Sequence, residues 1–138
     1  METMEKSAST CAWGPQKFGV ELIIDQEGVP GGQNAVIDVE DNEKGVFVGV
    51  GIMCDPTSVF YYSGLTPNVR ARLSNAPFGG HNIKSDARKL RGWGVGVQAD
   101  NLSFDTMLKS YVQNSTKESH GLKELCNIRV AMRIGCPF

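Results

Sequence analysis

The first half of the chain consists of short runs of β-branched and aromatic residues separated by polar turns. Four such runs cover residues 20–25, 35–40, 46–53 and 58–62. Runs of this composition, bounded by Gly, Pro, Asp and Asn, are typical of strands. Because the segments between them are rich in turn residues, we expect a meander of antiparallel strands.

The second half changes to patterns that favour helices. Val69 and Leu73, four residues apart, indicate one apolar helix face. The elements predicted here are a helix over 68–74, a break over 75–80, a short strand over 81–83, a helix over 86–90 ended by Gly92, a helix capped by Asp105 and running to about Val112, and a helix over 121–129. Strands followed by alternating strand and helix predict an α+β or α/β fold with a mixed sheet.

Composition narrows the class of protein. The chain has 138 residues, the usual size of one domain, and its 14 basic and 15 acidic residues lack the basic excess of most nonspecific DNA binders. We expect a flexible leader over residues 1–17 and one domain over 18–138. The sequence has no apolar run long enough to span a membrane and no signal-peptide pattern. Its four cysteines, Cys11, Cys54, Cys126 and Cys136, form no Cys-x-x-Cys pair, which favours reduced thiols in an intracellular protein.

Asp38 and Glu40 lie two residues apart near the end of an apolar run. On a strand such residues share one face, and two carboxylates held together repel each other unless a cation neutralises them. The alternative is a solvated strand edge. A second pair, Asp25 and Glu27, has the same spacing after an apolar run, but a Pro-Gly-Gly loop follows it.

Two later runs are more distinctive: Gly80-His81-Asn82-Ile83-Lys84-Ser85-Asp86 and Phe104-Asp105-Thr106-Met107-Leu108-Lys109-Ser110-Tyr111. Together with Asp38-Val39-Glu40 they resemble the 3′-5′ proofreading exonuclease domain of family A DNA polymerases. The resemblance implies an α/β fold, an RNase H-like mixed sheet flanked by helices. It also implies that Asp38, Glu40 and Asp86 are catalytic carboxylates that bind Mg²⁺ or Mn²⁺.

The same resemblance implies partners and a location. The substrate would be the 3′ end of single-stranded DNA during replication, and a polymerase domain would act with the chain, in cis or in trans. No membrane partner is implied. The protein would be intracellular, either cytoplasmic or nucleoid-associated.

The resemblance also implies that His81, Asn82 and His120 bind nucleic acid, and Lys84 of a basic cluster is a fourth candidate. By their chemistry alone, His81 could equally be a surface residue and Asn82 could satisfy a turn. A basic cluster of Lys84, Arg88, Lys89 and Arg91 could hold phosphates or form a solvated helix face. Four aromatic residues, Tyr61, Tyr62, Phe78 and Trp93, could stack on bases or belong to the core. We interpret Asp105 as a helix cap.

The resemblance covers residues 35 to 125. Family members continue to a third motif, Tyr-x-x-x-Asp, and nothing after Leu125 supplies it. This predicts a fold incomplete at the C-terminus, either a fragment or a naturally shortened relative. The alternative function is therefore a catalytically impaired module of the same fold that binds nucleic acid or a protein partner.

Overall fold

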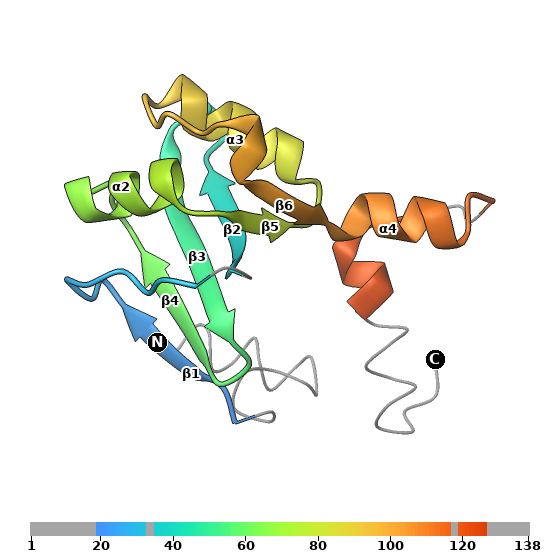
Figure 1. Ribbon diagram of the computed structural model, residues 1–138, viewed down its shortest axis with the longest axis horizontal. Coiled ribbons are helices and arrows are strands. Elements are labelled where there is room, and N and C mark those ends of the chain that lie inside the picture. Colours follow the sequence, from blue (N-terminus) through green and yellow to red (C-terminus); the bar gives the residue numbers. More distant parts are fainter. Residues whose placement is uncertain (1–18, 33–34, 117–118, 127–138) are drawn as a thin grey trace.

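A computed structural model of the protein describes residues 19–32, 35–116 and 119–126 (Figure 1). The predicted leader and the end of the last predicted helix lie outside these residues. Six strands are present: β1 (Glu21–Ile24), β2 (Ala35–Asp41), β3 (Phe47–Asp55), β4 (Ser58–Tyr62), β5 (Phe78–Gly80) and β6 (Leu102–Asp105). The helices are α2 (Pro67–Asn75), α3 (Ile83–Gly92), the short 3₁₀ helix η2 (Ala99–Asn101) and α4 (Thr106–Gln113). Residues 122–126 are also helical.

The strands form one mixed sheet in the order β1-β4-β3-β2-β5-β6. β2, β3 and β4 are antiparallel neighbours, as the meander prediction required. β5 runs parallel to β2 and β6 parallel to β5. The prediction of a mixed sheet flanked by helices is therefore confirmed.

The meander prediction is wrong for β1, which pairs in parallel with β4 at the far edge of the sheet rather than with β2. Three hydrogen bonds from two side chains hold the connection to β2 and keep it from forming a tight turn. Arg72, a buried residue of α2, donates hydrogen bonds to the carbonyls of Pro30 (3.0 Å) and Gly32 (3.2 Å). The Tyr62 hydroxyl donates to the Gly28 carbonyl at 2.8 Å. These long-range contacts dock the loop on α2 and β4, and local turn composition does not predict them.

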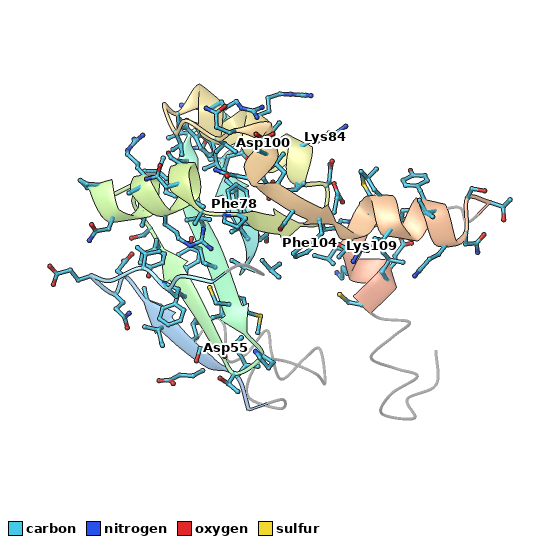
Figure 2. All side chains as sticks on the ribbon, in the orientation of Figure 1. Asp55, Phe78, Lys84, Asp100, Phe104 and Lys109 are labelled. Carbon is cyan, nitrogen blue, oxygen red and sulfur yellow. The ribbon has the colours of Figure 1, made fainter. Side chains whose placement is uncertain are left out.

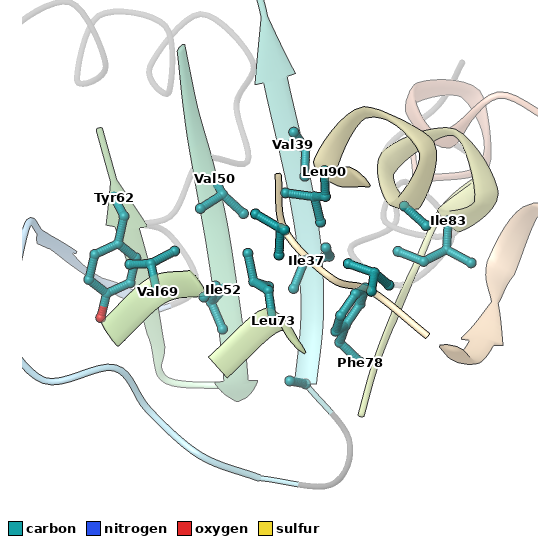
Figure 3. Close-up of a cluster of buried hydrophobic side chains, with 14 residues drawn as sticks. Ile37, Val39, Val50, Ile52, Tyr62, Val69, Leu73, Phe78, Ile83 and Leu90 are labelled. Atoms are coloured by element: carbon teal, nitrogen blue, oxygen red, sulfur yellow. The ribbon is translucent and has the colours of Figure 1, made fainter. Parts of the chain in front are cut away.

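One face of the sheet carries the core. Buried side chains from β2 and β3 meet those of α2 and α3 in a single cluster (Figure 3), so both helices cover the same face. Val69 and Leu73 are fully buried there, as their spacing predicted. α4 extends away from this core beyond the end of β6 (Figure 1). No helix in the described ranges is long and apolar enough to cross a membrane.

The strand predicted over 81–83 is wrong. The strand is β5, three residues earlier, and α3 already begins at Ile83. Two glycines make this possible: a Cβ at Gly79 would overlap the Phe104 ring, and one at Gly80 would lie 2.7 Å from the Ile37 carbonyl oxygen. Glycine therefore serves close packing of β5 between β2 and β6, although it usually disfavours strands.

Gly79→Ala is expected to destabilise the protein by about 1–3 kcal/mol, because the added methyl group must displace the Phe104 ring. Chemical denaturation monitored by circular dichroism measures this loss. Gly96→Ala is the matched control, since a Cβ there meets no atom within 4 Å. Equal stability of the two variants would contradict the packing argument.

Candidate active site

Asp38 and Glu40 of β2 lie on the face of the sheet opposite the core. Ile37 and Val39 are buried, at 3% and 5% exposure, whereas the alternate residues Asp38 and Glu40 are exposed. This alternation agrees with the strand geometry expected from the sequence. Opposite them on β3, Gly51 pairs with Asp38 and Gly49 pairs with Glu40, so no side chain from β3 covers either carboxylate at its own pair position.

Asp86 reaches the same end of β2 from the first turn of α3, and its residue is only 7% exposed. Burial and then the charge of Asp38 raise the pKa of Asp86 to about 6, with a smaller contribution from Glu40. A hydrogen bond from the Val39 backbone amide and the nearby Lys89 ammonium act in the opposite direction. The carboxyl group thus contacts the backbone between Asp38 and Glu40 and responds to both of their charges.

Glu40 responds to the same cluster. Desolvation raises its pKa above the ordinary value, and the charge of Asp38 and a hydrogen bond with the Asp38 carboxyl raise it further. The Lys89 ammonium opposes this rise. Desolvation and neighbouring carboxylates therefore make ionisation of both groups unfavourable. The neighbours are Asp38 and Asp41 for Glu40, and Asp38 and Glu40 for Asp86.

Lys89 is a site residue whose specific role the sequence did not reveal. Its Nζ donates to Asp41 Oδ1 at 3.0 Å, and both side chains are about one-third exposed, at 35% and 28%. Lys89 follows Asp86 by three residues, which puts both on one side of α3, and Asp41 directly follows Glu40. That spacing was the available signal for a cation held beside the carboxylates.

Replacing Lys89 with glutamine is expected to raise the pKa of both Asp86 and Glu40, because its ammonium lowers each of them. NMR titration of the side-chain carboxyl carbons measures both values. Stability should change by less than about 1 kcal/mol, since the ion pair is partly solvated. Lys84→Gln, on the exposed side of α3 (Figure 2), should leave both titrations unchanged.

The donors at this site are carboxylate oxygens, the ligands that Mg²⁺ and Mn²⁺ prefer. Among residues 19–32, 35–116 and 119–126, no three Asp, Glu, His or Cys side chains are already arranged to hold a metal ion. Asp38, Glu40 and Asp86 are thus electrostatically coupled without forming a closed cage.

Asp105 organises the start of α3 as well as its own helix. Its Oδ1 accepts hydrogen bonds from the amides of Met107 (2.8 Å) and Leu108 (3.3 Å), which confirms the predicted cap of α4. It also accepts from Asn82 N at 2.9 Å through Oδ1 and from Ile83 N at 3.0 Å through Oδ2. One buried carboxylate therefore fixes the first residues of the helix that carries Asp86.

Asn82 adopts a left-handed backbone conformation with φ of 57°, which asparagine tolerates better than most residues. It occupies the N-cap position of α3, but its side chain makes no capping hydrogen bond and is exposed. Its backbone forms the turn that leads into α3, while its side-chain amide makes no capping hydrogen bond and can bind a ligand. Lys84 is exposed nearby on α3.

The two candidate histidines are more enclosed than the sequence suggested. His81 Nδ1 lies 2.9 Å from Thr106 Oγ1, and His120 Nδ1 lies 2.7 Å from Ser110 Oγ. The His120 ring also stacks on Tyr111, and its residue is only 6% exposed. Both Nε2 atoms are buried without a hydrogen-bond partner among the described residues. In this conformation both rings contact residues of α4. Their contact with nucleic acid stays a prediction.

The other basic and aromatic candidates mostly have structural contacts. Arg91 Nε donates to the Val97 carbonyl at 2.8 Å, while Arg88 is exposed. Phe78 is fully buried, and Trp93 packs edge-on against Phe47 and donates to the Gly45 carbonyl at 3.0 Å. The Lys109 ammonium lies 5.7 Å from the Phe104 ring centroid (Figure 2).

The competing pair Asp25 and Glu27 lies just beyond the edge strand β1. Asp25 accepts hydrogen bonds from the Ser63 amide at 2.8 Å and the Ser63 hydroxyl at 2.7 Å. The hydroxyl and then the amide hold the pKa of Asp25 below its ordinary value. Its carboxylate therefore anchors the chain after β4, while the charges that reach Asp86 come from Asp38 and Glu40.

Two further features lie apart from the carboxylates. A hollow of about 390 Å³ between α4 and residues 122–126 is lined by Thr106, Lys109, Ser110, Gln113, Leu122, Leu125 and Cys126. Cys54 and Cys126 carry free thiols, and Cys11 and Cys136 lie outside the described residues.

The structure is similar to NrnC from Brucella melitensis. With NrnC carrying bound Mg²⁺ the TM-score is 0.63 at 19% identity, over 78% of this chain and 61% of that chain. With NrnC bound to pGG the TM-score is 0.60 at 21% identity, over 78% and 60%. The chain therefore has an RNase H-like fold, a mixed sheet of six strands flanked by helices.

This fold places β2, with Asp38 and Glu40, between the antiparallel strands and the two parallel strands β5 and β6. The described chain spans about three-fifths of the length of NrnC. A weaker likeness to the EXD2 exonuclease domain soaked in Mg and GMP has a TM-score of 0.46 at 17% identity, over 69% of this chain and 55% of that chain. No protein-family model matches the sequence, and a search of curated proteins finds no significant match.

Proposed function

We propose that the chain is a metal-dependent 3′-5′ exonuclease module that hydrolyses nucleotides from the end of a single strand. The observation that carries this proposal is that Asp38 and Glu40 share one face of β2 and that the charges of both raise the pKa of Asp86 on α3. Buried or paired carboxylates that repel one another are common at functional sites, because a substrate or a cation relieves the repulsion. The RNase H-like fold supports the same conclusion.

The carboxylates fit Mg²⁺ or Mn²⁺ as the cofactor. Asp38 and Glu40 are exposed, so their side chains can rotate toward Asp86 when a cation neutralises the site. A bound divalent ion would supply a water of lowered pKa and stabilise charge on the phosphate. The chain would hold the ion with Asp38, Glu40 and Asp86, and Lys89 would limit the repulsion among them.

The proposed substrate is a strand end rather than a duplex. Asn82 offers an exposed side-chain amide at the N-cap of α3, four residues before Asp86, and Lys84 and Arg88 offer exposed cations on α3. NrnC binds pGG, a short strand with a free end, in one of its structures. As the finer proposal, the chain would act on DNA as an intracellular proofreading exonuclease together with a polymerase domain, in cis or in trans.

The test is incubation of the full chain with a 5′-labelled single strand and Mn²⁺. A ladder of products shortened from the 3′ end is expected, and EDTA should abolish it. A second strand whose terminal linkage is a phosphorothioate should be shortened more slowly. Intact substrate at high enzyme concentration would contradict the enzymatic proposal.

One observation favours a second candidate, a module that binds strand ends without cutting them. Among the described residues, the carboxylates form no closed metal cage. Binding of the labelled strand, measured by fluorescence anisotropy, without any shortening in Mn²⁺ would support this candidate over the enzyme.

A further inference from the structure

Tyr61 lies on the same face of the sheet as the carboxylates. The strand registers pair Asp38 with Gly51 and Gly51 with Tyr61. Directly paired residues on neighbouring strands point their side chains to the same face. Tyr61 therefore belongs to the open face with Asp38 and Glu40, and its neighbour Tyr62 belongs to the buried core.

The Tyr61 ring crosses β3 toward Glu40. A Cβ built on Gly49 would overlap the Tyr61 hydroxyl and ring and would lie 2.8 Å from Cε2, so the ring rests directly on this glycine. Gly49 is the pair partner of Glu40. Because neighbouring strands lie about 4.8 Å apart, the Tyr61 hydroxyl ends roughly one strand spacing from Glu40.

The Tyr61 hydroxyl has no hydrogen-bond partner within the part of the chain that the structure describes. No hydrogen bond to it is present there, whereas the Tyr62 hydroxyl bonds the Gly28 carbonyl at 2.8 Å. Phe78 is buried in the core, and Trp93 packs against Phe47. Of the four aromatic candidates, Tyr61 is thus the one with a free polar group on the carboxylate face.

We propose that Tyr61 is a substrate-binding residue that positions the terminal nucleotide of the strand. Its ring would form an apolar wall against the sugar or base, and its hydroxyl would donate a hydrogen bond to a phosphate or sugar oxygen. Gly49 is required because any side chain there would lift the ring away from Glu40. This inference rests on the proposed exonuclease function and adds a residue that no acidic motif identifies.

The test compares Tyr61→Phe with Tyr62→Phe in the full chain. A short 5′-labelled oligothymidylate and Mn²⁺ serve as the probe, with binding followed by anisotropy and shortening by gel. Tyr61→Phe is expected to raise Kd and KM about five- to tenfold, with kcat changed less than about twofold and the thermal midpoint unchanged. Tyr61→Ala should weaken binding roughly tenfold or more. Tyr62→Phe should lower the thermal midpoint without changing KM.

Gly49→Ala provides an independent arm, because it moves the ring without altering the tyrosine. It should weaken binding in the same direction as Tyr61→Ala, and adding Tyr61→Ala to it should cause little further loss. If all Tyr61 variants bind the probe as tightly as the wild type, this inference is overturned while the proposed function stands. A wild-type chain that neither binds nor shortens the probe would overturn the proposed function and this inference with it.

Discussion

Replacing Asp86 with asparagine is expected to abolish Mn²⁺-dependent shortening of a single strand and to make the metal-free protein more stable above pH 6. Activity should fall roughly 10³-fold or more, because removing one member of a cooperating catalytic group removes most of its effect. Stability should rise because asparagine can keep the hydrogen bond from the Val39 amide without a buried charge.

The pH dependence follows from the raised pKa of Asp86, about 6 in the folded protein against an ordinary value of 3.8. Between these values the folded protein binds more protons than the unfolded chain, so stability falls as pH rises from about 4 to about 6. Above pH 6 the folded protein keeps the full cost of the ionised carboxylate. Metal binding should strengthen over the same range, because a cation competes with the proton.

Thermal unfolding from pH 4 to 8, with and without Mn²⁺, measures both effects. In the absence of metal, Asp86→Asn should unfold about 2–5 °C above the wild type at pH 7.5 and show no excess at pH 4. Mn²⁺ should raise the midpoint of the wild type but not that of Asp86→Asn. Asp100→Asn, at an exposed position of η2, is the control and should behave as wild type. A variant less stable than wild type at pH 7.5 would contradict the placement of Asp86.

Local patterns predicted the parts of the fold that depend on local chemistry. The alternation around Asp38 and Glu40, the apolar pair Val69 and Leu73, and the Asp105 cap all appear where expected. The position of β1 was missed because it depends on Arg72 and Tyr62 reaching back to the loop before β2.

Contacts between distant segments also explain what was missed at the candidate site. β5 was placed too late because Gly79 and Gly80 serve packing against Phe104 and Ile37 rather than a turn. β6 was not predicted at all, since four residues give too little alternation to distinguish a strand from a loop. The Tyr61 ring over Gly49 likewise becomes visible only when the register of β3 and β4 is known.

Asp105→Ala is expected to destabilise the protein by about 3–5 kcal/mol, more than any other single cap in the described chain. Its buried carboxylate accepts four backbone amides from two helix starts, those of Asn82, Ile83, Met107 and Leu108. Alanine would leave these donors without a partner where water reaches them poorly. Urea denaturation monitored by circular dichroism measures the loss.

Asp55→Ala is the matched control, because Asp55 also accepts several hydrogen bonds but does so in an exposed turn. Its loss should cost about 1 kcal/mol or less, since water can replace the carboxylate. Equal losses of stability for Asp55→Ala and Asp105→Ala would show that burial of the Asp105 carboxylate does not increase its contribution to stability.

Asp105→Asn separates the structural role of this residue from its effect on the site. An amide oxygen at Oδ1 can keep the bonds to Asn82, Met107 and Leu108, but the amide nitrogen would face the Ile83 N–H that Oδ2 now accepts. The expected cost is about 1–2 kcal/mol, with α3 loosened at its first turn, where Asp86 lies. The rise in thermal midpoint caused by Mn²⁺ should therefore shrink in this variant while α4 keeps its cap. An unchanged response to Mn²⁺ would mean that α3 holds Asp86 without help from Asp105.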